Sequence, residues 1–292
     1  MVDYWKKFID KNKYIYSCDM LRLAFTIRED CIGELRMHLC DPTKSYIKEF
    51  PINFTEFKYR NMWNLSYGTS AMALGIGFNG TRKEQAFDGF LEFNPNKCMS
   101  DKLCLHDLAF LLSRCVGVEV KRFDLAIDIP YDRELVHMRK DGRKYELHQK
   151  SYADRTEYLG QRNNPGRVKL YNKQIESELD IPLTRLEITF GGLDDIRTQI
   201  DKYLPQIWTD VSQKEMLFNL KDTDRVLCEL IRDSADPEYY LRQLTYHMRK
   251  KIEPYIICGD AKLVFETNCV ESIIAEIDNL VKYSCCGHIS GE

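Results

Sequence analysis

A short basic segment with a tyrosine is the strongest candidate for chemistry in this 292-residue chain. The segment from Arg167 to Glu176 reads RVKLYNKQIE. In a strand, alternation places Arg167, Lys169 and Tyr171 on one face and the two aliphatic residues between them on the core face. A phenol, with a pKa of about 10, is a weak nucleophile unless a metal or cations stabilise its anion. The pattern therefore predicts a tyrosine nucleophile that acts on a phosphate. Ordinary packing of a tyrosine at a strand end is the alternative.

Acidic residues on the polar faces of predicted strands form a second candidate group. The segment 120–129 alternates clearly, so that two acids and Arg122 project from one face. Acids gathered on one sheet face offer an oxygen-lined pocket for Mg²⁺ or Mn²⁺, which neutralises charge during phosphoryl transfer. Arg122 and Arg185 are equally suited to bind these acids as structural ion pairs. The candidate metal ligands are Glu92, Asp124, Asp128 and Glu187.

Other catalytic patterns are weak or missing. Gly75, Gly77 and Gly80 have the spacing of a dinucleotide-binding turn, but too few residues separate them from the strand predicted at Phe90 for a crossover helix. A glycine-rich hairpin is the better interpretation. No HxH pair that could clamp a metal ion is present, and neither is the GxSxG signature of serine hydrolases.

These residues require a sheet to position them. Strands are predicted at 20–27, within 54–78, at 90–94, 120–129, 156–159, 167–171 and 183–190, with a capped helix after Ser100 and Asp101 and a short helix from Asn172 to about Leu179. Beyond Gly191-Gly192 the period becomes helical. The predicted class is α+β, with a mainly antiparallel mixed sheet, flanking helices and a mainly helical C-terminal region. Residues 1–192 would form the catalytic unit and residues 193–292 a helical region for origin recognition or dimer contacts.

Composition directs any nucleic-acid contact to a local surface. The net charge of −3 and the isoelectric point of about 6.1 give no overall attraction to DNA. From His137 to Lys173, however, ten lysines and arginines face four acids, a local net charge of +6. A solvated basic face is the plain alternative. Eleven cysteines without CxxC pairs, and no apolar stretch long enough for a signal peptide or a membrane span, predict reduced thiols in a cytoplasm and no membrane partner.

Four segments, in this order, resemble the replication-initiator transfactor family of small Gram-positive rolling-circle plasmids. They are LEFNPNK (91–97), KRFDLAID (121–128), TEYLGQR (156–162) followed by RVKLYNK (167–173), and TRLEI (184–188). The resemblance implies that Tyr171 is the nucleophile and that Glu92 and Asp124 bind the metal, with Asp128 and Glu187 in support. Arg167 and Lys173 would stabilise charge at the phosphate. The candidate DNA contacts are Arg162, Lys169, Arg185, Arg249, Lys250 and Lys251.

The resemblance also implies an activity and partners. The expected activity is metal-dependent, site-specific nicking and joining of one DNA strand through a covalent 5′-phosphotyrosine, which leaves a 3′-hydroxyl primer. Expected partners are double-stranded origin DNA with a hairpin, single-stranded DNA, a second copy of the chain and a host helicase of the PcrA type, in a bacterial cytoplasm. The alternatives are a relaxase of a conjugative element, disfavoured because few residues precede the first predicted strand, a non-catalytic DNA-binding regulator, and a nucleotide-dependent enzyme.

Overall fold

A large antiparallel sheet organises the chain in the computed structural model, which describes residues 7–50, 61–77, 88–98, 100–151, 153–209, 220–232, 234, 236–256 and 262–285. The strands are β1 (Phe8–Ile9), β2 (Ile15–Ile27), β3 (Ile47–Phe50), β4 (Asn61–Tyr67), β5 (Ser70–Ile76), β6 (Gly89–Phe93), β7 (Cys115–Ile129), β8 (Val136–Met138), β9 (Tyr145–Gln149), β10 (Arg155–Leu159), β11 (Val168–Asn172), β12 (Thr184–Phe190) and β13 (Ile207–Thr209). Eleven of these described strands form one sheet, in the order β3-β4-β5-β6-β2-β7-β12-β11-β10-β9, with β1 paired to β2. Strands β8 and β13 form a separate ribbon.

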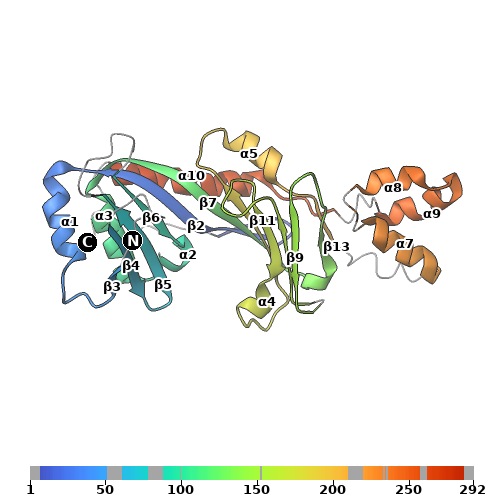
Figure 1. Cartoon of the computed structure of the whole chain (residues 1–292), viewed down its shortest axis with the longest axis horizontal. Coiled ribbons are helices and arrows are strands. Elements are labelled where there is room, and N and C mark those ends of the chain that lie inside the picture. The colour runs from blue at the N-terminus through green and yellow to red at the C-terminus, as the bar shows by residue number, and fades with distance from the viewer. Residues whose placement is uncertain are drawn as a thin grey trace.

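Helices flank the sheet, and a group of helices lies beyond one end of it (Figure 1). They are the 3₁₀ turns η1 (Glu29–Cys31) and η2 (Arg133–Leu135), and α1 (Ile32–Leu39), α2 (Pro95–Cys98), α3 (Lys102–Leu112), α4 (Lys173–Glu176), α5 (Ile196–Tyr203), α7 (Asp222–Arg232), α8 (Pro237–Gln243), α9 (Tyr246–Ile256) and α10 (Thr267–Cys285). Helix α10 packs against β7 and β2, while α7, α8 and α9 pack on one another (Figure 1). The predicted α+β class, with its mainly antiparallel sheet and helical C-terminal region, is confirmed.

Strand alternation builds the main core. In β7 the side chains of Phe123, Leu125, Ile127 and Ile129 are buried, as their period-two spacing predicts. The same core includes residues of α10, among them Ile273. A second, smaller cluster lies within α7, α8 and α9. The functional division of the chain at residue 192 stays a prediction.

Gly75 lies in an antiparallel strand pair, and Gly192 lies where the backbone passes close to Val120. Strand β5, which holds Gly75, pairs antiparallel with β6, so this region is no parallel βαβ unit. Gly80 lies outside the described residues. At Gly192, φ is +76° and an added Cβ would lie 2.8 Å from the Val120 carbonyl oxygen, so the position requires glycine.

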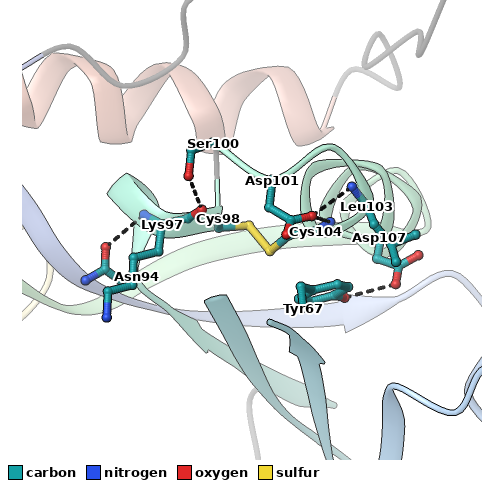
Figure 2. The surroundings of a disulfide bond; sticks show 9 residues. All are labelled: Tyr67, Asn94, Lys97, Cys98, Ser100, Asp101, Leu103, Cys104 and Asp107. Atoms are coloured by element: carbon teal, nitrogen blue, oxygen red, sulfur yellow. Dashed lines mark hydrogen bonds between the residues drawn. A yellow bond between two sulfur atoms is a disulfide. The ribbon is translucent and has the colours of Figure 1, made fainter. Parts of the chain in front are cut away.

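A disulfide clips α2 to α3 (Figure 2). Cys98 ends α2 and Cys104 lies in the first turn of α3, and the turn between them brings their Cα atoms to 5.4 Å. Asp101 caps α3, as predicted, because its carboxylate accepts hydrogen bonds from the backbone amides of Leu103 and Cys104. The expectation of reduced thiols throughout is wrong for this pair, because a spacing of six residues does not reveal the turn.

None of the helices in the described ranges is long and apolar enough to span a membrane.

Candidate active site

Antiparallel pairing brings the predicted tyrosine and all four predicted acids to one face of the sheet. Tyr171 on β11 lies opposite Arg185 on β12, and Arg185 lies opposite Asp128 on β7. In the next row, Lys169 lies opposite Glu187. Directly paired residues of antiparallel strands point to the same face, so these five side chains share one surface.

Tyr171 is held by a hydrogen bond to an acid. Its hydroxyl donates to Oε1 of Glu187 over 2.6 Å, across the diagonal between neighbouring strands. The side chain is only 4% exposed, whereas the sequence predicted a hydroxyl that emerges among cations. The difference arises because the side chains of Lys169 and Glu187 lie against the tyrosine on this face. Burial, together with the charge of Glu187 and the hydrogen bond to it, raises the pKa of Tyr171, and the charge of Arg185 acts in the opposite direction.

Two lysines flank the tyrosine ring. The Lys169 ammonium lies 3.7 Å from the ring centroid and 3.7 Å from Oε2 of Glu187, while that of Lys173 lies 5.9 Å from the ring centroid and also binds Glu176. Burial raises the pKa of Glu187, and the charge of Lys169 opposes this effect. The phenol, the carboxylate and the Lys169 ammonium are therefore in mutual contact, which is an arrangement suited to proton transfer from the phenol.

Arg185 is fixed by two aspartates. Its Nε and Nη2 donate to Asp128 over 2.6 and 2.8 Å, and its Nη1 donates to Asp19 over 3.1 Å. This guanidinium is buried, so in this arrangement it neighbours Tyr171 instead of facing solvent. Sequence reasoning missed Asp19, because it lies at a register shift between Cys18 and Met20, and a bulge has no reliable signature in a single sequence.

The predicted metal ligands are separated and paired with basic residues. Glu92 on β6 binds Arg22, and Asp124 on β7 binds Arg122 through both carboxylate oxygens. Strands β6 and β11 are four strand intervals apart, roughly 19 Å along the sheet. Within the part of the chain that the structure describes, no group of three or more His, Cys, Asp or Glu side chains could hold a metal ion. The acids in this arrangement do not fit a bound Mg²⁺ or Mn²⁺, and the metal site stays a prediction of the resemblance.

The other predicted cations divide between bonded and exposed positions. Arg167 stacks on the Tyr158 ring at 4.2 Å from its centroid and donates to Glu146 and to the Gly160 carbonyl, so its guanidinium is already bonded. Arg162, in contrast, is exposed on the turn between β10 and β11. Of these two, only Arg162 is presented for contact with a partner.

The three basic residues of α9 differ in their exposure and in their ion pairs. Arg249 is paired with Glu253 one turn later, over 3.0 Å, and Lys251 binds the buried carboxylate of Asp224 on α7. Lys250 is exposed and forms no ion pair with another described residue. The role of these three residues in DNA binding stays a prediction, and Lys250 is the one that is free to carry it.

Comparisons with solved structures give a weak similarity. No family model matches the chain, and no curated protein matches it. A solved structure of the rolling circle replication initiator protein from Geobacillus stearothermophilus is 14% identical, with a TM-score of 0.40, over 75% of this chain and 85% of that one.

Proposed function

We propose that the chain initiates rolling-circle replication by nicking and rejoining one DNA strand through Tyr171. The observation that carries the proposal is the contact between Tyr171 and Glu187, on the strand whose sequence matches the nucleophile motif of the transfactor resemblance. A hydroxyl that donates to a partly buried carboxylate beside a lysine has both a proton acceptor and a stabilising cation at hand.

In the proposed reaction the carboxylate of Glu187 accepts the phenol proton. The Tyr171 oxygen attacks the phosphorus, a bond from phosphorus to the phenol oxygen forms, and the bond to the 3′ oxygen of the preceding nucleotide breaks. That oxygen takes up a proton and leaves as the 3′-hydroxyl that primes synthesis. Lys169 and Lys173 stabilise the negative charge near the tyrosine. One phosphodiester replaces another, so the reaction needs no nucleotide and is reversible.

Access to Tyr171 is a separate requirement. Because the side chain is buried, a DNA strand reaches the hydroxyl only after the tyrosine or the chain around it moves. Mg²⁺ or Mn²⁺ remains part of the proposal through the resemblance, and no step above depends on it. Nicking assayed with each cation and with a chelator tests the requirement.

The proposed substrate is double-stranded origin DNA that extrudes a hairpin with a single-stranded loop. Exposed Arg162 and Lys250 are the proposed phosphate contacts, since neither forms an ion pair with an acid among the described residues. A second copy of the chain and a PcrA-type helicase complete the proposed assembly. A relaxase would use the same chemistry and differs only in starting transfer.

The test is a denaturing gel of purified protein incubated with a labelled hairpin from its own replicon. The label is placed on the 3′ side of the cut, so that a covalent product carries it. A protein-linked band should form with the natural chain and disappear with Tyr171→Phe. Tyr14→Phe is a matched control, because Tyr14 is also 4% exposed but precedes β2. Adduct formation by Tyr171→Phe would refute the assignment of the nucleophile.

A non-catalytic DNA-binding regulator is the second candidate. The observation that favours it is the low exposure of Tyr171, together with the pairing of Glu92, Asp124 and Asp128 to arginines, which is what a structural network requires. It predicts salt-dependent binding to the hairpin without any covalent band.

A further inference from the structure

Arg185 lies at the centre of a side-chain network that reaches beyond the tyrosine. Its β12 position lies between Tyr171 on β11 and Asp128 on β7. The bidentate contact with Asp128 uses Nε and Nη2 and leaves Nη1 to another partner. That partner is Asp19, over 3.1 Å.

Asp19 lies at a bulge of β2, on the face of the sheet that also holds Arg185. The register of β2 on β7 shifts between Cys18 and Met20, so that Asp19 is the extra residue. An extra residue re-aims its side chain relative to regular alternation. Ile15 and Ser17 lie opposite Asp128 and Ala126, so the alternation of β2 assigns Asp19 to the face that holds Asp128 and Arg185, and the bulge leaves Asp19 without a direct pair on β7.

Two asparagines hold the bulge from the segment that follows β6. The side-chain amide of Asn94 donates to Oδ1 of Asp19 over 3.1 Å, and that of Asn96 donates to the Cys18 carbonyl over 2.7 Å. Asp19 is thus fixed from both sides, by Asn94 and by Arg185. Such a supporting contact is typical of side chains that orient a functional group.

We propose that Asp19 is a positioning residue that holds the Arg185 guanidinium opposite Tyr171 for the nicking reaction. The inference rests on the proposed function, because Tyr171 must be the attacking group for the position of Arg185 to affect the rate. Asp128 alone neutralises and anchors Arg185, and Asp19 adds the third contact that prevents the guanidinium from rotating about that anchor.

The first measurement observes Arg185 without DNA. In ¹⁵N-edited spectra, rotation about the Cζ–Nη bonds of Arg185 should be slow in the natural chain and faster in Asp19→Asn, with the signal assigned through Arg185→Lys. Asp88→Asn is the matched control, because Asp88 accepts a hydrogen bond from the Ile27 amide at the far end of β2. Unchanged Arg185 signals in Asp19→Asn would overturn the proposal, whatever the nicking rate.

The second measurement is single-turnover nicking at saturating hairpin DNA. Asp19→Asn should slow nicking by about 10- to 100-fold, the effect of a misplaced catalytic group, while its affinity for the hairpin stays within about twofold. The double variant Asp19→Asn/Arg185→Lys should be no slower than Arg185→Lys, since both act through one guanidinium. Additive losses, or a loss of binding equal to the loss of rate, would overturn the positioning role.

A third variant tests the same contact without replacing Asp19 itself, so misfolding of Asp19→Asn does not decide the outcome. Asn94→Ala removes only the outer support of Asp19 and should change the Arg185 signals and the rate in the same direction, by less. If the natural chain forms no adduct, the proposed function fails, and the Arg185 spectra alone still decide whether Asp19 holds the guanidinium.

Discussion

The Tyr171 hydroxyl and the Glu187 carboxylate lie 2.6 Å apart, on neighbouring strands of the large sheet. The contact is diagonal, because Tyr171 is paired directly with Arg185 and Glu187 with Lys169. Each partner is thus next to a cation of the opposite strand. Glu187, which the sequence suggested as a support for a metal, here contacts the atom that would react.

Glu187→Gln should slow nicking by about 10²-fold or more, which is the lower end of the effect of losing a general base. The amide keeps the size of the side chain but cannot take the phenol proton. Binding of the hairpin should be unchanged, because the side chain is largely covered by Tyr171 and Lys169. Single-turnover gels and a binding titration measure the two quantities.

Glu187→Asp is the control, since it keeps a carboxylate and should retain more activity than Glu187→Gln. Equal rates for the natural chain and Glu187→Gln would remove Glu187 from the chemistry.

Lys250→Ala should weaken hairpin binding and reduce the dependence of log affinity on log salt by about one contact. The reason is that Lys250 is exposed on α9 and is not paired with an acid in the part of the chain that the structure describes. Arg249→Ala, which breaks only the pair with Glu253, should change the salt dependence less. Titrations at several salt concentrations measure both slopes, and identical slopes for the natural chain and Lys250→Ala would exclude α9 from phosphate contact at this position.

The strands could be predicted from sequence where one face is apolar and the other polar. The clear alternation of β7 predicted both its face and its acids, and the segments around Tyr171 and Glu187 were predicted within one or two residues. Register could not be predicted, because it depends on the pairing of strands far apart in the chain. For that reason the sequence gathered Glu92 with Glu187, whereas β6 and β12 are separated by two strands. The bulge at Asp19 and the disulfide at Cys98 depend on local turns that composition does not encode.

Replacing both Cys98 and Cys104 by serine should lower the free energy of unfolding by about 2 kcal/mol, the entropic effect of opening so short a loop. Both side chains are buried, so their hydroxyls add a further small cost. Urea denaturation of the oxidised natural chain and the double variant measures the difference. Cys40→Ser, at an exposed free cysteine, is the control and should be neutral. A natural chain that denatures identically with and without a reductant would show that the disulfide does not contribute.

A buried aspartate outside the active site predicts how stability depends on pH. Asp107 on α3 accepts hydrogen bonds from the Tyr67 hydroxyl, over 2.9 Å, and lies 3.3 Å from Nε2 of His38 on α1 (Figure 2 shows the tyrosine contact). Burial acts to raise the pKa of Asp107, but the bonds from His38 and Tyr67 outweigh it, so the pKa lies below its ordinary value. The carboxylate therefore binds a proton less readily in the folded chain than in the unfolded chain.

The direction of the pH dependence of stability follows from this difference in proton binding. Where the unfolded state binds more protons, stability rises with pH, so the contribution of Asp107 is complete above the ordinary carboxyl pKa of about 3.9 and is lost as the pH falls toward the lower folded value.

Asp107→Asn should cost about 3 kcal/mol at pH 7, because it leaves His38 and Tyr67 without their charged acceptor. The difference between the natural chain and Asp107→Asn should stay constant from neutral pH to about pH 5 and shrink below about pH 4. Urea denaturation across this range measures it, with Asp41→Asn as the control for a partly exposed carboxylate that Thr43 of its own loop binds. A difference as large at pH 3 as at pH 7 would show that Asp107 stabilises the fold through packing and not through its charge.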